Sequence, residues 1–405
     1  IRKKEIFELL KGIGVKVLQI PSIDDLLSGK SKIDTLRPIA VEDILGRESV
    51  PPNKELLGPH ISDCIVCVTG AGGSIGAELC KKIVELKPSL LLLIERSELN
   101  LYTIHQSLIK EVSKSTTIEP ILGSANDRDL IEKLFKKYKV EIVFHAAAYK
   151  HVPLVEKNPL AGLSNNVLST KVICEEAKKA NVPRFILIST DKAVRPTNIM
   201  GASKRLSELV VKAFAEEELL SQGKKNKTIF AMVRFGNVLG SSGSVVPLFS
   251  KQIASGGPVT LTHPKIIRYF MTVSEAAELV LQAGVLAEGG DVFLLDMGEP
   301  VLIKNLAEQM ISLSGLTIKN RENQNGDIEI IYTGLRPGEK LYEELLIEAN
   351  SESTLHPLIF KANENGIPFK DFWLKFFTFQ KALKDRNQSE VFKLLSELVP
   401  EWGKT

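Results

Sequence analysis

Short apolar runs alternate with amphipathic segments along the chain from about residue 61 onwards. Between the runs, apolar residues recur at the spacing of one helical face, which predicts intervening helices. Strands that are apolar along their whole length and alternate with helices are typical of a parallel sheet covered on both faces. The pattern therefore predicts an α/β fold with a Rossmann-type, doubly wound parallel sheet. The predicted strands span residues 63–70, 89–95, 117–123, 140–148, 184–190 and 228–236, and the clearest helices span 77–87, 129–138 and 165–180.

The rest of the chain divides by composition. We interpret 61–235 as the sheet domain and 236–350, which is richer in Gly and Ser, as a smaller C-terminal lobe that closes over a substrate. Residues 351–405 form a helical tail with many aromatic residues in this interpretation. Residues 1–60 combine a short helical pattern with a β-like segment and end in a Pro- and Asn-containing turn. We expect this lead-in to pack on the core.

Composition narrows the class of protein. The 405-residue chain is 44% hydrophobic and 25% charged, as in ordinary globular domains. Its 52 Lys and Arg residues against 49 Asp and Glu residues give a net charge of +3, which is too small to indicate a nucleic-acid surface. No apolar run reaches the roughly 20 residues of a membrane helix. The chain begins at Ile1, and we expect it to be part of a longer protein.

The four cysteines are Cys64, Cys67, Cys80 and Cys174, too few for a disulfide framework in a chain of this length, which indicates a reducing compartment. Cys64 and Cys67 form a C-x-x-C in the first predicted strand, where residues three apart point to opposite faces. We interpret them as small buried apolar residues rather than metal ligands or a redox pair, and we expect no metal site.

The first predicted strand leads directly into a glycine-rich loop and then a helix. Gly70, Gly73 and Gly76 recur in a G-x-x-G-x-x-G spacing, with Ser74 and Ile75 between the last two. A cofactor pyrophosphate requires a tight turn, a backbone without side chains and free N–H groups at a helix start. An ordinary turn between strand and helix is the alternative. The position at the head of the strand–helix series favours a dinucleotide site.

The second and third strands end near further candidate cofactor contacts. Glu95 follows the glycine loop by about 20 residues, where an acidic residue holds the ribose hydroxyls of NAD. Arg96 follows it, and an arginine can instead meet the 2′-phosphate of NADP. We favour NAD over NADP, with a surface charge pair as the alternative. Ser124 and Ala125 follow the third strand, near the expected adenine edge.

The fourth strand ends in small residues followed by polar ones. Ala146 and Ala147 would let the backbone pass close to the cofactor. His145, just before them, is interpreted as a core histidine with hydrogen-bond partners. Lys150 and His151 follow in a loop at the carboxyl edge of the sheet, where ligands bind in folds of this kind. Both are candidates for contact with a substrate.

The fifth strand is followed by the most specific motif of the chain. Thr190, Asp191 and Lys192 emerge at its carboxyl end. Met200 and Lys204 lie four residues apart, and therefore on one face of the next predicted helix. This arrangement resembles the Y-x-x-x-K signature of short-chain dehydrogenases, with a methionine in place of the tyrosine.

With S-T-D-K before it, M-x-x-x-K resembles the long-form, configuration-retaining UDP-N-acetylglucosamine 4,6-dehydratases of the bacterial polysaccharide-biosynthesis (capsule and O-antigen) family. The segments that begin at Arg234, Arg268 and Leu335 are similar to that family too, and the likeness covers roughly residues 40–350. The resemblance implies a UDP-sugar substrate and a homo-oligomer. It also implies a membrane-anchoring N-terminal region in the full-length protein, at the cytoplasmic face of the bacterial inner membrane.

The reaction implied by the resemblance is a dehydration in which NAD is regenerated. C4 of the sugar is oxidised, water is eliminated across C5 and C6, and the stored hydride returns to C6. Asp191 is the candidate acid for the C6 hydroxyl, and Lys192 the candidate base at C5, for which a lowered pKa is expected. Lys204 would bind the nicotinamide ribose, and Thr190 would hydrogen-bond the C4 oxygen. Because the thioether of Met200 cannot accept the C4 proton, Thr190, Asp191 or a bound water must help.

Substrate contacts are expected in the C-terminal part of the chain. Asn237 would contact the sugar or phosphate, and Arg268 and Arg336 would pair with the diphosphate. Glu339 would take the uridine ribose hydroxyls. Each of these residues alone is also compatible with a solvated surface position.

Three other hypotheses stay open. A nucleotide-sugar 4-epimerase shares the fold and the first hydride step, but it normally keeps the tyrosine and has no use for an acid–base pair at C6 and C5. A non-catalytic NAD-binding scaffold in a glycan assembly complex would explain Met200, although not the retention of Asp191, Lys192 and Lys204. An inverting dehydratase would also normally keep the tyrosine.

Overall fold

The computed structural model describes residues 18–19, 37–38, 53–113, 115–221, 227–344, 351–362, 364 and 369–403. Most of the expected lead-in, with its helical pattern, lies outside the described residues. Inside it, β1 (Leu18–Gln19) pairs antiparallel with β2 (Arg37–Pro38). The short helix α4 (Lys54–Ile61) packs against α13 (Val273–Leu286), so this end of the lead-in contacts the core.

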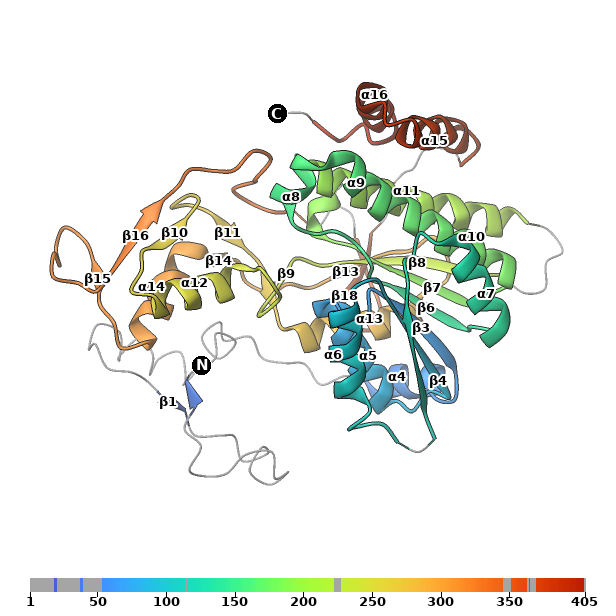
Figure 1. Ribbon diagram of the computed structural model, residues 1–405, viewed down its shortest axis with the longest axis horizontal. Coiled ribbons are helices and arrows are strands. Elements are labelled where there is room, and N and C mark those ends of the chain that lie inside the picture. The colour runs from blue at the N-terminus through green and yellow to red at the C-terminus, as the bar shows by residue number, and fades with distance from the viewer. Residues whose placement is uncertain are drawn as a thin grey trace.

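A nine-stranded sheet forms the centre of the described part of the chain (Figure 1). Its order is β17-β18-β13-β8-β7-β6-β3-β4-β5, parallel throughout from β13 to β5, with β18 and β17 antiparallel at the other edge. The six predicted strands are present, and the expected Rossmann-type α/β fold is confirmed. The order reverses at β3, so the carboxyl ends of β3 and β6 flank the crevice where such sheets bind ligands. The strands span β3 Ile65–Thr69, β4 Leu90–Glu95, β5 Thr117–Leu122, β6 Ile142–His145, β7 Arg184–Ile188, β8 Ile229–Arg234, β13 Val292–Leu295, β17 Ser351–Ser353 and β18 Ile359–Ala362.

Helices cover both faces of the sheet because its strands alternate their side chains between two apolar cores. Val66 and Val68 of β3 face the core shared with α5, α6 and α13. Cys67, between them, faces the opposite core, shared with α7, α10 and α11. These helices span α5 Ser74–Glu85, α6 Glu98–Leu108, α7 Arg128–Tyr138, α10 Ser169–Ala180 and α11 Ile199–Leu220.

The C-x-x-C motif is part of this packing. Cys67 is buried in β3, and Cys64 is half-buried just before the strand. Burial raises the pKa of the Cys67 thiol to about 12, which keeps it protonated and unreactive. The structure thus agrees with the interpretation of these cysteines as packing residues.

A smaller lobe with its own apolar core lies beside the sheet (Figure 1). It falls within the expected range 236–350, but α13 and β13 in that range return to the main sheet. The lobe is therefore interrupted in the chain, because an apolar strand such as β13 does not reveal from its sequence which sheet it joins. Its elements are β9 Asn237–Val238, α12 Val245–Ala254, β10 Val259–Leu261, β11 Ile267–Arg268, β12 Phe270–Met271, β14 Val301–Leu302, α14 Ile303–Leu313, β15 Ile318–Lys319 and β16 Ile328–Tyr332.

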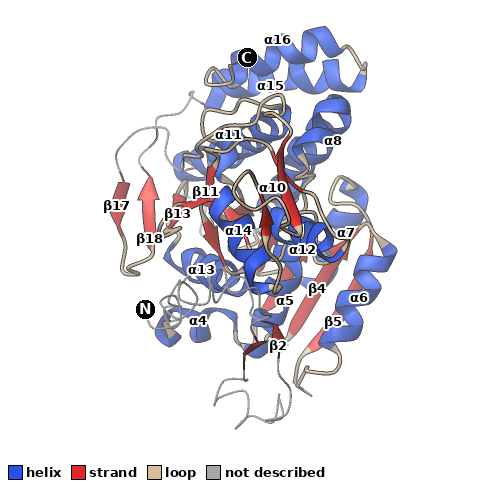
Figure 2. Ribbon diagram, turned by 90° about the vertical axis from the view of Figure 1, so that its left-hand side faces the viewer, coloured by secondary structure: helices blue, strands red, loops and turns tan. Residues whose placement is uncertain are grey.

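The C-terminal part contributes β17 and β18 to the sheet and then two helices. Figure 2 shows α15 (Phe369–Lys384) and α16 (Gln388–Leu398) side by side next to α11, and α15 contacts α11 directly. Trp373 of α15 meets Phe214 of α11 edge to face, with ring centroids 5.0 Å apart. None of the helices in the described ranges is long and apolar enough to cross a membrane.

A buried network of charges joins the sheet, α11 and the C-terminal part. Arg234 of β8 is fully buried, and its guanidinium donates to the two carboxylate oxygens of Glu208 at 2.8 and 2.7 Å. It also pairs with both oxygens of Glu364. Arg205 of α11 donates to Glu208, Glu364 and Glu401 at 3.1, 2.9 and 3.0 Å. Although burial raises the pKa of Glu208, Arg234 lowers it to about 2, so the network is ionised.

We expect Arg234→Ala to lower the free energy of unfolding by about 3–5 kcal/mol, because it leaves the buried Glu208 and Glu364 without their main partner. Urea unfolding measures this loss. The double variant Arg234→Met, Glu208→Gln should recover part of it, since one uncompensated charge is gone. A loss below about 1 kcal/mol for Arg234→Ala, in the range of a surface pair, would contradict the role given to the network.

Candidate functional site

The carboxyl end of β3 and the start of α5 form a backbone cradle. Gly70 has a φ of +67°, and a Cβ there would lie 2.7 Å from the backbone of Ala147, so only glycine fits. A Cβ on Gly76 would lie 2.0 Å from the carbonyl oxygen of Gly70, which brings α5 directly against the loop. Gly73, the N-cap of α5, has no side chain to cap the helix. The first N–H groups of α5 are thus suited to an anion.

The other residues predicted around the loop surround this cradle. Ser74 is the first residue of α5, and Ile75 after it is half-buried against the core. Ala146 follows β6, and its N–H donates to the carbonyl of Thr69 at 3.1 Å. The strand ends of β3 and β6 therefore run together at the crevice, with only small side chains between them and the loop.

Glu95 ends β4 beside the cradle and is buried. Its carboxylate accepts backbone N–H groups from Gly72 at 3.1 Å, Arg96 at 2.9 Å and Ser97 at 3.0 Å, which fixes its orientation. The guanidinium of Arg96 donates to the Tyr149 hydroxyl and to Asn165 Oδ1. Glu95 and Arg96 thus point to different partners, although they are adjacent in the chain.

A cavity of about 530 Å³ adjoins these residues. Two of the predicted cofactor contacts, Arg96 and Ser124, line it, whereas Ala125 is buried in the core. A cavity beside a buried carboxylate and a glycine cradle fits the adenosine end of a dinucleotide. The lining residues are Arg96, Leu122, Gly123, Ser124, Asn126, Tyr149, Ala161, Ser164 and Asn165.

A single 3-10 turn, η2 (Asp191–Ala193), presents the catalytic candidates after β7. Thr190 is its N-cap, and the Thr190 hydroxyl donates to Asp191 Oδ1 at 2.8 Å. Lys192 Nζ donates to the same oxygen at 2.9 Å and to Asn237 Oδ1 at 3.3 Å. The second oxygen, Asp191 Oδ2, is buried without a hydrogen-bond partner among the described residues. The turn thus brings four of the predicted residues together.

The pKa of Lys192 differs from the sequence-based expectation, which was that it would be lowered. Burial lowers the pKa of Lys192, but the carboxylates of Asp191 and Glu343 outweigh it, and the pKa is raised. The expectation was wrong because two anions face the ammonium group, one of them from a segment that sequence analysis had not connected with Lys192. Lys192 is therefore a cation paired with Asp191 in this structure.

Helix α11 lies directly against the catalytic turn. A Cβ on Gly201 would lie 2.2 Å from the carbonyl oxygen of Lys192, so glycine permits this contact. Met200, before it, is 3% exposed. Lys204 Nζ donates to the carbonyl of Ile188 at the end of β7 at 2.6 Å. Burial lowers the pKa of Lys204 to about 8, so this lysine can exchange its proton near neutral pH.

Lys150 and His151 approach the same region from the end of β6. Desolvation, and to a lesser degree the charge of Lys192, lower the pKa of Lys150. The His151 ring contacts the loop between β9 and α12, where a Cβ on Gly243 would lie 2.5 Å from its Cε1. In the same loop, the Ser242 N–H donates to Ser74 Oγ at 3.3 Å. This loop therefore touches both the cradle and the predicted substrate side.

The predicted substrate residues of the smaller lobe have protein partners. Arg268 donates to the carbonyls of Ile267, Lys340 and Leu341 at 2.7, 2.8 and 3.2 Å, so its guanidinium supports the backbone around residue 340. Glu339 accepts the Thr262 hydroxyl at 3.0 Å and the Arg336 N–H at 3.1 Å. Arg336 is exposed. Their roles toward a diphosphate or ribose stay predictions.

Two polar residues that sequence analysis did not single out contact residues of this region. The Glu343 side chain is 5% exposed, and its Oε1 lies 3.8 Å from Lys192 Nζ. Asn166, in the π-helical segment η1 (Ser164–Leu168), binds the N–H and carbonyl of Tyr149 at 2.7 and 3.0 Å. A π-helical turn has no sequence pattern that would have revealed Asn166. Glu343 lies in the segment that begins at Leu335, which was already noted as similar to the family. That similarity is the signal that could have drawn attention to Glu343.

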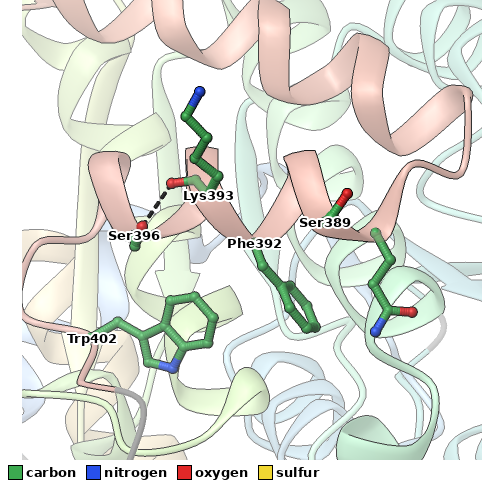
Figure 3. Close-up of a pocket in the computed structure, with 6 residues that line it drawn as sticks. Ser389, Phe392, Lys393, Ser396 and Trp402 are labelled. Atoms are coloured by element: carbon green, nitrogen blue, oxygen red, sulfur yellow. Dashed lines mark hydrogen bonds between the residues drawn. The ribbon is translucent and has the colours of Figure 1, made fainter.

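Another cavity, of about 560 Å³, lies on α16 (Figure 3). Phe392 and Trp402 meet edge to face in it, with ring centroids 5.9 Å apart. It contains one charged side chain, Lys393, and no acid–base pair, so it is not a candidate catalytic site. Within the described ranges, no group of three or more His, Cys, Asp or Glu residues could hold a metal ion. The cavity is lined by Gln388, Ser389, Phe392, Lys393, Ser396 and Trp402.

The sequence profile of the family described as polysaccharide biosynthesis protein matches residues 66–364. The chain belongs to this family. It is 46% identical over 356 residues to the capsular polysaccharide biosynthesis protein CapD of Staphylococcus aureus, a match that covers 88% of this chain and 56% of that protein. The chain thus spans about half the length of this relative.

Two further similarities bear on the site. The chain is 28% identical over 340 residues to the UDP-N-acetylglucosamine 4,6-dehydratase (inverting) of Campylobacter jejuni, covering 84% of this chain and 94% of that one. The X-ray structure of Pen from Bacillus thuringiensis matches with a TM-score of 0.65 and 30% identity, over 75% of this chain and 88% of that chain. The family match and these similarities confirm the resemblance to the polysaccharide-biosynthesis family.

His145 ends β6 as a buried histidine with hydrogen-bond partners, as interpreted from the sequence. Its Nδ1 lies 2.6 Å from the Thr69 hydroxyl, and its Nε2 lies 3.2 Å from the Thr170 hydroxyl. Burial, and to a lesser degree the charge of Lys204, lower its pKa to about 3. The imidazole is therefore neutral throughout the physiological range.

This histidine is expected to make the fold sensitive to mild acid. The unfolded chain protonates it below pH 6.5, whereas the folded chain does so only near pH 3, so stability present above pH 6.5 is lost as the pH falls. Between pH 6.5 and 5 the loss should be about 2 kcal/mol. Urea unfolding of the wild type and His145→Gln at both pH values measures it. Equal pH slopes in the two proteins would contradict the prediction.

Gly70→Ala is expected to weaken NAD binding about tenfold or more, because the methyl group must enter a left-handed position against Ala147. Isothermal titration calorimetry measures the affinity, with circular dichroism to establish folding. Gly256→Ala is the matched control, since Gly256 has a φ of +84° and nothing within 4 Å of an added Cβ. An equal loss of affinity in both variants would mean that the cradle is not the binding site.

Proposed function

We propose that the chain catalyses the NAD-dependent dehydration of a UDP-N-acetylhexosamine, in the first instance UDP-N-acetylglucosamine, to the UDP-4-keto-6-deoxy sugar. The product would serve bacterial surface polysaccharide or glycan biosynthesis, and the enzyme would be a lyase. The observation that carries this proposal is the Asp191–Lys192 pair, whose carboxyl and ammonium groups share a hydrogen bond at the carboxyl edge of the sheet.

The pair matches what an elimination needs. Loss of water across C5 and C6 requires a base at one carbon and an acid at the oxygen of the next. Asp191 and Lys192 place such groups 2.9 Å apart, and Asn237 holds the lysine from its other side. Asp191 would protonate the departing C6 hydroxyl, and Lys192 would take the C5 proton. A proton returned to C5 by the same lysine restores the original configuration, so we favour retention over inversion.

The residues around the crevice fit a dinucleotide cofactor. The glycine cradle would hold the pyrophosphate, Glu95 the adenosine ribose and Lys204 the nicotinamide ribose. When bound, NAD supplies the acceptor of the C4 hydride and its later donor to C6. We favour NAD over NADP because the carboxylate of Glu95 would repel a 2′-phosphate, while the guanidinium of Arg96 is engaged by Tyr149 and Asn165.

Because Met200 stands in place of the usual tyrosine, the C4 hydroxyl lacks that residue as the acceptor of its proton. Thr190 offers a route, because its hydroxyl already donates to Asp191 Oδ1 at 2.8 Å. A C4 hydroxyl bound to Thr190 could pass its proton to Asp191 through this hydrogen bond. Asp191 would then carry the proton that the C6 hydroxyl needs as it leaves.

Two alternative functions are weaker on chemical grounds. A 4-epimerase transfers hydride at C4 alone and would make no use of the paired acid and base. A non-catalytic scaffold would have no need to keep Lys204 at a pKa of about 8 or a lysine held by Asp191 and Asn237. Burying interacting charges, as at the end of β7, costs free energy. A reaction that uses these charges would explain why the chain keeps them.

For the whole protein, we propose a homo-oligomer anchored by an N-terminal membrane region at the cytoplasmic face of the bacterial inner membrane. The sequence resemblance to long-form dehydratases supports this proposal.

Proton NMR of the protein with UDP-N-acetylglucosamine and catalytic NAD in deuterated water tests the proposed reaction. We expect a new C6 methyl signal, deuterium at C5, an unchanged D-configured ring and no net NADH. Lys192→Ala and Asp191→Asn should each lower the rate about a hundredfold or more, as for loss of an acid or base. Lys157→Ala, which changes an exposed lysine, is the control.

Other outcomes of this experiment are equally clear. A C4 epimer without a methyl signal would establish an epimerase. An L-configured ring would mean inversion at C5. NAD binding with no turnover over a panel of nucleotide sugars would establish the scaffold.

A further inference from the structure

We propose that Glu343 is a positioning residue that acts through Lys192: its carboxyl group stores a proton, so that Lys192 can be neutral while Asp191 is protonated. This inference rests on the proposed dehydration and assigns a role to a side chain for which the sequence analysis predicted none. It explains how the site can operate with a methionine at position 200.

The Glu343 carboxylate is buried beside the catalytic turn. Its Oε1 lies 3.8 Å from Lys192 Nζ and 3.8 Å from the Arg268 guanidinium, and the side chain is 5% exposed. Its Oε2 is buried without a hydrogen-bond partner among the described residues. A buried carboxylate oxygen that lacks a partner is costly, and a proton on it removes that cost.

The segment that carries Glu343 is held in place by backbone contacts. Arg268 donates to the carbonyls of Lys340 and Leu341, and Lys340 Nζ donates to the carbonyl of Val194, just after the catalytic turn, at 2.9 Å. Glu344, the next residue, pairs with Arg195 at 3.1 Å on the outside. The chain thus directs one of two adjacent glutamates inward, to Lys192, and the other outward.

The number of protons handled in the proposed reaction requires a third group, beside Asp191 and Lys192, that can hold one of them. Lys192 begins as a cation paired with the Asp191 anion, so the pair holds one proton. Oxidation at C4 releases a second proton from the C4 hydroxyl. If both stayed on the pair, Asp191 would be a good acid, but Lys192 would remain cationic and could not act as a base. A neighbouring carboxylate that takes one proton resolves this conflict.

With Glu343 the cycle closes without a net change. The C4 proton passes through Thr190 to Asp191 as the hydride leaves C4. Lys192 gives its proton to Glu343 once its Nζ moves from 3.8 Å to hydrogen-bond distance of the carboxylate. Asp191 then protonates the departing C6 hydroxyl while Lys192 takes the C5 proton, and water leaves. The hydride arrives at C6 and Lys192 returns its proton to C5. Glu343 finally returns its proton to Lys192, which restores the initial state.

The electrostatic surroundings suit Glu343 to this role. Burial raises its pKa, and the Asp191 charge adds to this effect. Lys192, Arg268 and Lys340 act in the opposite direction without cancelling it. Lys150 is a further cation in this region, and the charge of Lys192 contributes to lowering the pKa of Lys150. A carboxyl group with a raised pKa accepts a proton from a lysine more readily than a solvated glutamate does.

The pH dependence of turnover tests the proposal. In Glu343→Gln we expect kcat at pH 7 to fall about a hundredfold, the usual scale for loss of a proton acceptor, with little change in KM. The rate should rise with pH as Lys192 loses its proton to solvent, whereas the wild type should be flat over that range. Glu343→Asp should recover activity, and Glu344→Gln is the matched control. An active Glu343→Gln with a wild-type pH profile would overturn the proposal.

A titration of Lys192 separates this inference from the proposed function. Lysine side chains labelled with ¹⁵N can be followed by NMR, with Lys192→Ala to assign the signal. The pKa of Lys192 should fall in Glu343→Gln and stay unchanged in Glu344→Gln; no movement in Glu343→Gln would overturn the proposal. If that pKa falls but the wild type dehydrates no nucleotide sugar, the coupling of the two groups stands and the proposed dehydration fails.

Discussion

A guanidinium group inside a parallel sheet must be neutralised there, because a buried charge without a partner is strongly destabilising. Arg234 of β8 meets this requirement with Glu208 of α11 and Glu364 beyond β18. Glu208 also accepts the Ser189 hydroxyl at 2.6 Å, immediately before the catalytic turn. One set of charges therefore fixes the central strand, the helix that carries Met200 and Lys204, and the strand end that carries Thr190 and Asp191.

Close backbone contacts then bring the residues of the candidate site together. The cradle touches the end of β6 only because Gly70 has no side chain, and α11 touches the catalytic turn only because Gly201 has none. Lys204 can then reach the carbonyl of Ile188, and Lys192 can reach Asp191 and Asn237. The candidate site thus results from the packing of helices and strands at the carboxyl ends of the parallel strands.

Local signals in the sequence were enough to predict the sheet, the glycine-rich loop and the polar turn after β7. Each is encoded by neighbouring residues: apolar runs, a glycine spacing, and a polar stretch at a strand end. The raised pKa of Lys192 was not predicted, because the charge of the adjacent Asp191 was not weighed against burial and because the second anion, Glu343, lies about 150 residues away in the chain. The interruption of the smaller lobe by β13 was missed for a related reason, since strand pairing is a non-local property.

The loop between β9 and α12 links the two parts of the molecule. Its Ser242 N–H bonds to Ser74 of the cradle, and its Gly243 contacts His151. A displacement of this loop would therefore break contacts with both the cradle and His151. In the proposed dehydration the cofactor is restored in every cycle and need not exchange, and a loop that rests on the proposed phosphate site would slow its escape. The proposed function then implies that NAD is retained through many turnovers, like a prosthetic group.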